Sequence, residues 1–249
     1  MLAAERKDEI LARLQRDGRV VVPELVAALS VSEDTIRRDL QELAALGLLC
    51  RVHGGALPVA PDLPPFVGRS EVAATAKAAL AEAAIPLLES ARTLVIDGGT
   101  TAVEVARRLP AAWAGVVVTN APPVAAALAV HPTAEVVLVG GRLLKDEQVA
   151  VGPVAVDAFR ALRADVCLLG ICAFHPEVGA TAASVEEAQV KREMVACATT
   201  VVALATADKL NASYPWVVAS ISEIDHLITD GTEDITSAFA AAGADLVSV

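Results

Sequence analysis

The chain of 249 residues has few aromatic side chains and no long apolar run. Aromatic residues are 3% of the sequence, although hydrophobic residues of all kinds reach 55%. A composition of this sort, rich in Ala and Val, suits helices packed on a parallel sheet. No apolar run reaches the roughly 18 residues that a membrane helix needs, and the charged N-terminus differs from a signal peptide. We therefore expect a cytoplasmic chain with no membrane partner.

Cysteine is scarce, and so are the residue groupings on which many catalytic and cofactor sites depend. The four cysteines form no C-x-x-C pair, which favours buried thiols in a reducing compartment over metal or redox roles. We find no Ser/His/Asp grouping, no metal-binding cluster, and neither a G-x-G-x-x-G nor a Walker A motif. The sequence therefore predicts no catalytic residue, no metal and no cofactor.

An excess of positive charge is also missing, because the net charge is −11. Taken alone, this argues against a nucleic-acid partner. The acidity is uneven, however: residues 1–60 carry a net charge of −1, and residues 61–249 carry −10. A nearly neutral segment can bind DNA if its arginines share one face, and an acidic remainder would stay away from the duplex.

The N-terminal segment has the pattern of three short helices followed by two strands. Helices are predicted over residues 4–17, 24–29 and 33–45, and strands over 48–52 and 56–59. Apolar residues at helical spacing support the helices, Pro23 suits the start of the second, and Ser32 suits the N-cap of the third. Three helices and a two-stranded wing make a winged helix-turn-helix.

The third predicted helix carries the candidate DNA contacts. Thr35, Arg37 and Arg38 lie in its first half, the part that enters a major groove in this architecture. Adjacent arginines cannot lie on one line of a helix, so we expect one on bases and the other on a phosphate. The alternative is that they pair with acids on a solvated face, namely Asp34, Asp39 or Glu42. The full set of predicted DNA-binding residues is Ser32, Thr35, Arg37, Arg38, Arg51 and His53.

A linker and a second domain follow the predicted wing. Four prolines fall within residues 58–65, and we divide the chain into a DNA-binding domain (1–57), a linker (58–69) and an α/β domain (70–249). A helix is predicted over 70–88. Strands are then predicted over 93–97, 116–120, 135–140, 166–170, 200–206 and 226–230, mostly separated by helical stretches. This alternation predicts an α/β fold with a mostly parallel sheet.

A glycine-rich turn between a strand and a helix is a candidate anion site. Asp97, Gly98, Gly99, Thr100 and Thr101 follow the first predicted strand of this domain and precede a helical stretch. Glycines let the backbone approach a ligand, and the free N–H groups at the start of a helix attract anions.

Further polar or glycine residues follow other predicted strands. Ligands of open α/β sheets bind outside the carboxyl ends of the strands, so these corners predict one shared pocket. They are Asn120, Gly141, Arg142, Gly170, Asp208 and Lys209. Lys191, in a helical stretch, is either a cation that reaches a phosphate or the i,i+4 partner of Glu187.

Both segments resemble the DeoR family of bacterial regulators. In the N-terminal part the resemblance is carried by Arg6, Ile10, Leu14, the run Ser32 to Leu40 and the HGG of the wing. In the second it is carried by F-x-x-R at 66–69, Lys77, DGGTT at 97–101, TN at 119–120, GGR at 140–142, the segment 168–181, EEAQVKREM at 186–194 and DKL at 208–210.

The resemblance implies a repressor of a carbohydrate operon that binds double-stranded operator DNA and is released by a phosphorylated sugar. It implies an effector domain similar in fold to ribose-5-phosphate isomerase, with the phosphate at the DGGTT loop and Lys191 near it. It also makes Asp39 an internal partner of an arginine. Because helix-turn-helix regulators usually read two half-sites, we expect a homodimer or homotetramer. The residues TAD before Lys209 and Leu210 after it depart from the commoner family form, which leaves the identity of the sugar open.

Two alternatives remain beside a regulator. A sugar-phosphate isomerase-like enzyme would need a carboxylate base over the sugar carbons, and the segment 170–174 has none, although Asp97 and Asp208 stand at strand ends. A protein-binding adaptor would leave the converging polar corners without a role.

Overall fold

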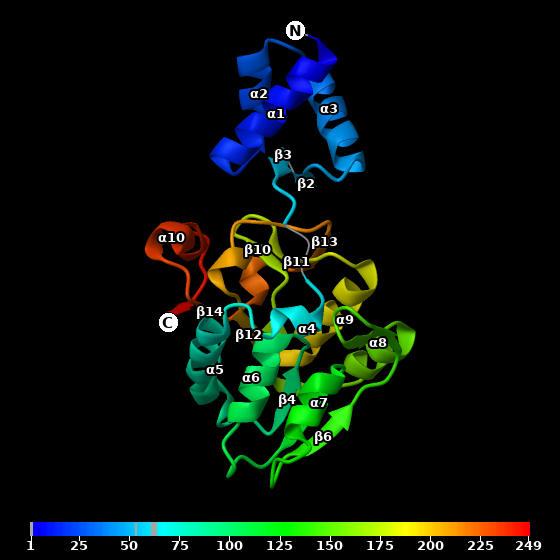
Figure 1. Cartoon of the computed structure of the whole chain (residues 1–249), viewed down its shortest axis with the longest axis vertical. Coiled ribbons are helices and arrows are strands. Elements are labelled where there is room, and N and C mark those ends of the chain that lie inside the picture. The colour runs from blue at the N-terminus through cyan, green and yellow to red at the C-terminus, as the bar shows by residue number, and fades with distance from the viewer. Residues whose placement is uncertain (1, 53, 61–63) are drawn as a thin grey trace.

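The computed structural model describes residues 2–52, 54–60 and 64–249. They form a small N-terminal domain at one end of the molecule and a larger α/β domain at the other, joined by a narrow connection (Figure 1). Both parts predicted from the sequence are therefore present, and the fold class is α/β with an N-terminal helix-turn-helix. No helix of the described residues is long and apolar enough to cross a membrane.

The N-terminal domain holds its three helices around one apolar core. Its elements are α1 (Ala3–Asp17), β1 (Val20–Val21), α2 (Val22–Leu29), α3 (Glu33–Ala45), β2 (Cys50–Val52) and β3 (Gly55–Leu57). Ile10, Leu25, Ile36 and Leu40 are fully buried among the helices. Ser32 caps α3 as predicted, since its Oγ accepts a hydrogen bond from the Thr35 backbone N–H at 3.3 Å.

A buried ion pair ties the first helix to the third. The Arg6 guanidinium on α1 donates to both carboxylate oxygens of Asp39 on α3, at 2.5 and 3.1 Å. Both residues are buried, with 9% and 3% of their surface exposed. Beside this pair, Lys7 and Glu42 make a second bridge between the same helices at the surface. Asp39 is thus an internal partner of an arginine, and that arginine is Arg6.

The wing differs from the prediction in its strands. It has three strands in the order β1-β3-β2, because Val20 and Val21 pair antiparallel with β3. A two-residue strand gives no alternating pattern in the sequence, so β1 was missed. The predicted strands over 48–52 and 56–59 shorten to β2 and β3.

The larger domain is built on a fully parallel seven-stranded sheet in the order β15-β14-β12-β9-β4-β5-β6. The strands are β4 (Thr93–Ile96), β5 (Val116–Thr119), β6 (Glu135–Leu138), β9 (Ala164–Gly170), β12 (Ala198–Leu204), β14 (His226–Thr229) and β15 (Leu246–Ser248). All six predicted strands are present, and β15 is additional. From β4 the chain adds β5 and β6 on one side and then returns to add β9 and β12 on the other, so the sheet is doubly wound.

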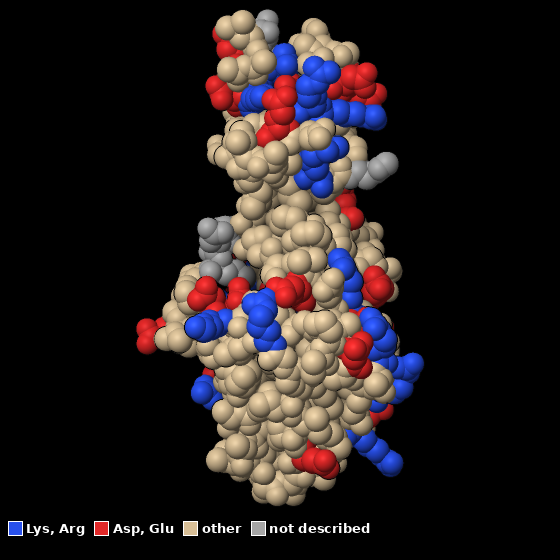
Figure 2. Space-filling model, turned by 90° about the vertical axis from the view of Figure 1, so that its right-hand side faces the viewer, with Lys and Arg blue, Asp and Glu red and all other residues tan. Residues whose placement is uncertain are grey.

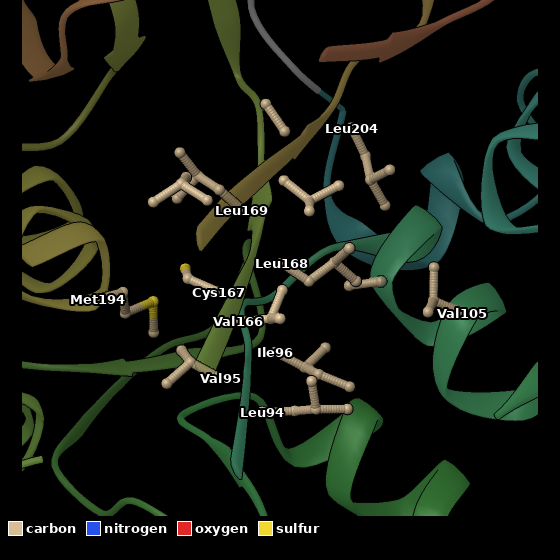
Figure 3. Close-up of a cluster of buried hydrophobic side chains, with 14 of the residues drawn as sticks. Leu94, Val95, Ile96, Val105, Val166, Cys167, Leu168, Leu169, Met194 and Leu204 are labelled. Carbon is tan, nitrogen blue, oxygen red and sulfur yellow. The ribbon is translucent and has the colours of Figure 1, made fainter. Parts of the chain in front are cut away.

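Helices cover both faces of this sheet. They are α4 (Phe66–Arg69), α5 (Ala74–Leu88), α6 (Thr100–Arg108), α7 (Pro122–Leu128), α8 (Pro153–Arg160), α9 (Val185–Cys197) and α10 (Glu233–Ala241). Figure 3 shows Val95 and Cys167 pointing toward Met194 of α9, while Ile96 and Leu168 point toward the side of Val105 on α6. Alternate residues of β4 and β9 therefore fill two cores, one on each face.

Two small antiparallel sheets complete the domain, and neither was predicted. One pairs β7 (Arg142–Leu144) with β8 (Val149–Val151), and the other has the order β10-β11-β13, from β10 (Ala173–His175), β11 (Gly179–Ala182) and β13 (Trp216–Ala219). The three-stranded sheet lies on the side of the large domain that faces the helix-turn-helix (Figure 1). Its strands come from distant segments, which local sequence patterns do not reveal.

Hydrogen bonds attach the segment between the domains, and the wing beside it, to the large domain. The Ala60 backbone N–H donates to the Ser213 carbonyl at 3.1 Å, and the Cys50 thiol of the wing donates to the Tyr214 carbonyl at 3.6 Å. Farther along, within the expected linker 58–69, α4 packs on the large domain through Phe66, whose N–H donates to the Asp146 carbonyl at 2.6 Å. The last residues of the expected linker are thus part of the large domain.

The buried Arg6–Asp39 pair generates a stability prediction. Asp39→Ala should destabilise the helix-turn-helix by about 3–5 kcal/mol, because it leaves a buried guanidinium without a counterion. Hydrogen exchange of the α1 and α3 amides in the full chain measures this local stability. Glu42→Ala breaks only the exposed bridge to Lys7 and is the matched control, with an expected loss within about 1 kcal/mol. Equal protection in both variants would contradict the prediction.

Candidate functional site

A pocket opens where the order of the sheet reverses. β4 and β9 are neighbours, and the chain leaves them in opposite directions, so their carboxyl ends form the switch point at which doubly wound sheets bind ligands. The loops after β4, β9 and β12 meet there around a cavity of about 90 Å³. Eight of the predicted effector residues line it: Gly98, Gly99, Thr100, Thr101, Gly170, Lys191, Asp208 and Lys209.

The glycines of the pocket are required by close packing and by backbone conformation. A Cβ on Gly98 would collide with the Val149 side chain, and one on Gly170 would lie 2.6 Å from the Gly98 carbonyl oxygen. Gly99 instead has open space around it and a φ of +113°, which side chains other than glycine rarely allow. The chain thus passes from β4 into α6 through a turn that brings its backbone close to two neighbouring segments.

A buried ion pair stands behind this turn. The Lys191 ammonium on α9 pairs with the Asp97 carboxylate at the end of β4, and it also donates to the Gly170 carbonyl at 2.8 Å. The Glu187 carboxylate lies 3.5 Å away, so the i,i+4 pair is present as well. Asp97 in turn accepts from the Gly170 N–H at 3.0 Å. Lys191 and Asp97 have only 4% and 1% of their surface exposed.

This pair holds Lys191 in its charged form. Burial alone would lower the pKa of the ammonium, but the negative charges of Asp97 and Glu187 outweigh burial and raise the pKa above its ordinary value. The carboxylate of Glu187 also accepts a hydrogen bond from the Cys172 thiol at 3.4 Å. Burial, followed by the charge of Glu187, raises the pKa of that thiol to about 12. Lys191 therefore brings to the pocket a charge that the protein's own acids already neutralise.

Three other cations surround the pocket, and two were absent from the predicted site. Arg69, Lys77 and Lys209 line it, yet no described acid forms an ion pair with any of them. Burial, then the positive charges of Lys209 and Arg69, lower the pKa of Lys77. Burial also lowers the pKa of Lys209, and Arg69 and Lys191 lower it further. Arg69 and Lys77 belonged to matched family motifs, which was the signal that could have identified them.

Four predicted effector residues are not part of the pocket lining: Asp97, which stands behind it in the pair with Lys191, and Asn120, Gly141 and Arg142. Asn120 supports the β7–β8 hairpin by donating to the Ala150 carbonyl at 2.7 Å. Gly141 packs against that hairpin, where a Cβ would lie 2.5 Å from the Val151 carbonyl oxygen. Arg142 is exposed and pairs with Glu186. The residues after β5 and β6 therefore position the hairpin that carries Val149, instead of joining the lining themselves.

Acidic side chains also reach the pocket. Glu147, Glu187 and Asp208 line it; Asp208 was predicted at a strand end, whereas Glu147 and Glu187 were not among the predicted effector residues. Glu187 is engaged with Lys191, whereas Asp208 is exposed. In the described residues no group of three or more His, Cys, Asp or Glu side chains could hold a metal ion.

The helix-turn-helix presents its predicted contacts at the surface. Arg37 and Arg38 are exposed on α3, and Arg37 pairs with Glu33 one turn away at 2.6 Å. Of the acids considered as alternative partners, Asp39 and Glu42 pair with α1, and Asp34 forms no ion pair with a described residue. Arg38 has no ion pair among the described residues. Thr35 is half-buried, and its hydroxyl contacts that of Ser32 at 2.9 Å.

The wing adds one further described candidate, because Arg51 is exposed on β2. His53, the other predicted wing contact, lies outside the described residues. Charges of both signs are mixed over the N-terminal domain (Figure 2), in agreement with its net charge near zero. This view of the N-terminal domain therefore shows no broad basic face.

A winged helix-turn-helix joined to a doubly wound domain with a pocket at its switch point defines a two-domain transcription regulator. The DeoR-like helix-turn-helix domain family matches residues 6–60, and the DeoR C-terminal sensor domain family matches residues 72–231. The chain belongs to the DeoR family of transcriptional regulators, and it is a DNA-binding regulator, not an enzyme.

Named relatives match nearly the whole chain. A transcriptional regulator named GlpR from Haloferax volcanii is 39% identical over 240 residues, covering 95% of this chain and 93% of its own. The transcriptional repressor GlcR of Bacillus subtilis is 31% identical, covering 92% and 89%. The glycerol-3-phosphate regulon repressor of Escherichia coli is 30% identical, covering 95% and 94%.

Solved structures resemble the chain more distantly. Ribose 5-phosphate isomerase A from Neisseria gonorrhoeae has a TM-score of 0.38 and 13% identity, covering 56% of this chain and 53% of its own. The sorbitol operon regulator SorC from Klebsiella pneumoniae has a TM-score of 0.39 and 11% identity, covering 82% and 94%. Superpositions at this level carry no argument about the ligand.

The Asp97–Lys191 pair predicts that Lys191 supports the fold of the pocket. Lys191→Met should lower the free energy of unfolding of the large domain by about 3–5 kcal/mol, because Asp97 is left buried without a counterion. Thermal and denaturant unfolding of the full chain measure the loss. The matched control is Arg142→Met, which breaks the exposed pair with Glu186, also on α9, and should cost at most about 1 kcal/mol. If Lys191→Met unfolds like the wild type, the pair does not have this role.

Proposed function

We propose that this regulator is a repressor of a carbohydrate-metabolism operon in the cytoplasm, and that a phosphorylated sugar releases it from its operator. The observation that carries the proposal is the convergence of Arg69, Lys77 and Lys209 on a pocket at the start of α6. Unpaired cations that depress one another's charged forms favour an anion between them. The three cations converge there although residues 61–249 carry a net charge of −10.

The groups around the pocket match the two parts of a sugar phosphate. The backbone at Gly98 and Gly99, the hydroxyls of Thr100 and Thr101 and the N-terminus of α6 are donors suited to phosphate oxygens. Asp208 and Glu147 are acceptors suited to sugar hydroxyls. One relative is named a glycerol-3-phosphate regulon repressor, a name that contains a small phosphorylated compound.

A homodimer or homotetramer follows from the way helix-turn-helix proteins read paired half-sites. The large domain offers an uncovered edge for self-association. β6 is the last strand of the sheet, and its Val137 and Leu138 are exposed, as is Leu143 of the neighbouring hairpin. Exposed apolar residues on an edge strand commonly mark an interface.

Arg37 and Arg38 are expected to carry operator recognition. Changing either one to Ala should cost about 1–3 kcal/mol of operator affinity if it contacts a base, with an unfolding midpoint close to that of the wild type because both are exposed. Fluorescence anisotropy with a labelled operator measures the affinity at fixed salt. Arg13→Ala on α1 is the control. Undiminished operator affinity in the double variant Arg37→Ala/Arg38→Ala would refute this role.

The pocket is expected to bind a phosphorylated sugar without converting it. A ligand at 100 times its Kd stabilises the native state by about 2.7 kcal/mol, which corresponds to an increase in Tm of about 5–10 °C for a chain of this size. A thermal-shift screen of ribose, fructose, glucosamine and tagatose phosphates and of glycerol 3-phosphate measures it. NMR of the same mixtures should show no isomer formed. Repeated turnover of any of them would instead favour an isomerase-like activity.

A further inference from the structure

The outer edge of β6 carries main-chain groups that no strand of the described residues uses. On its inner edge, the N–H groups of Glu135 and Val139 donate to carbonyls of β5 and of the residue before it, at 2.9 and 2.7 Å. Alternate residues of a parallel strand bond to the same neighbour. The N–H and C=O groups of Val136 and Leu138, and by the same alternation those of Gly140, therefore point away from the sheet.

This edge lacks the features that keep edge strands apart. Proteins usually protect such edges with lysine, proline or a bulge, but β6 contains neither residue, and Glu135 is the only charged residue between positions 109 and 141. Val137 and Leu138 point to opposite faces of the strand, and 40% and 50% of their surface is exposed. Neither face of β6 is therefore fully covered at its carboxyl end.

Helix α7 extends the apolar surface beside the edge. It packs against β6, and the run 121–130, which includes it, contains no polar side chain, although a surface helix normally turns polar residues outward. Ala126, Ala129 and Val130 are exposed. Figure 2, which views the side toward which β6 lies in Figure 1, shows few charged side chains over the lower part of the large domain.

The edge of the small antiparallel sheet is different. β13 also ends its sheet and has two exposed apolar residues, Trp216 and Val217. The Arg192 guanidinium donates to the Val217 carbonyl, however, so a charged side chain already occupies part of that edge. The free main-chain groups and the charge-free surface occur together at β6.

We propose that β6 pairs antiparallel with β6 of a second copy of this chain, around a two-fold axis, so that the two seven-stranded sheets become one. The inference rests on the proposed function, because it gives the homo-oligomer proposed there its interface. Leu138 would lie opposite itself, and Val136 opposite Gly140 of the other copy. This register satisfies the outward groups of all three residues at once.

The two ends of the edge favour a second copy as the occupant. Glu135 precedes the outward residues and Arg142 follows them, and both are exposed. In the proposed register Glu135 of one copy lies opposite Gly141 of the other, next to Arg142, so opposite charges meet on both sides of the axis. Because a stable interface buries about 1,200–2,000 Å² in total, the short strands need further contact area. The apolar surface of α7, repeated on both copies, supplies it.

The test compares Leu138→Arg with Val217→Arg, which places the same charge on the edge of β13. Leu138→Arg sets two like charges against each other at the axis and should raise the dissociation constant between copies by about 100-fold or more. Val217→Arg should associate as the wild type does. Sedimentation equilibrium of the full chain measures the association, and the unfolding midpoint of both variants should stay close to that of the wild type because both side chains are exposed.

A cross-link tests the register without adding charge. Opposed residues of a hydrogen-bonded antiparallel pair have Cα atoms about 5.5 Å apart, within the range that a disulfide spans. Leu138→Cys should therefore form a covalent dimer on mild oxidation. The wild type, with its four native cysteines, and Val217→Cys are the controls, and neither should be linked.

The outcomes separate the interface from the rest of the proposed function. If Leu138→Arg associates like the wild type and Leu138→Cys is not linked, the β6 interface is refuted while the homo-oligomer stands. If Leu138→Arg dissociates but Leu138→Cys is not linked, the pairing around Leu138 is refuted. A wild type that stays monomeric with and without operator would overturn both the interface and the homo-oligomer. Stabilisation by a sugar phosphate reports on the pocket alone and should persist in Leu138→Arg.

Discussion

The ion pair between Asp97 and Lys191 is the constraint around which the large domain is arranged. It joins the end of β4 to α9, and through Gly170 it also fixes the end of β9. A charged pair taken out of water is stable only when its remaining hydrogen bonds are made, and these bonds require the close approach of the two strand ends. The position of the pocket between them is a consequence. The ammonium nearest the strand ends is already neutralised, so the proposed phosphorylated ligand would require other cations.

Regular elements with strong periodicity could be predicted from the sequence, and short elements with distant partners could not. The helices α1, α2 and α3 follow from apolar spacing and from Ser32 as a cap, and six strands of the large sheet follow from Val-rich runs between helices. β1 has two residues, and β10, β11 and β13 have three or four each. Their stability comes from pairing with segments far away in the chain, which no local pattern records. The prolines before the short helix α4 indicated a linker, so the helix was not predicted.

The site could be predicted to the extent that it obeys a rule of topology. We expected the strand ends to share one pocket, and the residues after β4, β9 and β12 do lie together there. The expectation failed for Asn120, Gly141 and Arg142, because the chain after β6 forms a hairpin beside the pocket and Asn120, after β5, holds that hairpin. The rule also concerns only residues at strand ends. Arg69 precedes the sheet and Glu187 lies on a helix, so the rule could not predict either of them.

Pro64 and Arg69, which precede the first helix and strand of the expected sheet domain, line the pocket, and this limits how freely the two domains can be recombined. A chimaera that joins another DNA-binding domain at Ser70, where the sequence suggested the second domain begins, would discard Pro64, Phe66 and Arg69. Such a protein would keep the whole parallel sheet and yet have an open cavity and an uncovered patch where Phe66 packs. A junction within 58–60 keeps these residues but changes the contact with Ser213. The part of this protein that could be transferred as a sensor therefore begins before its sheet domain does.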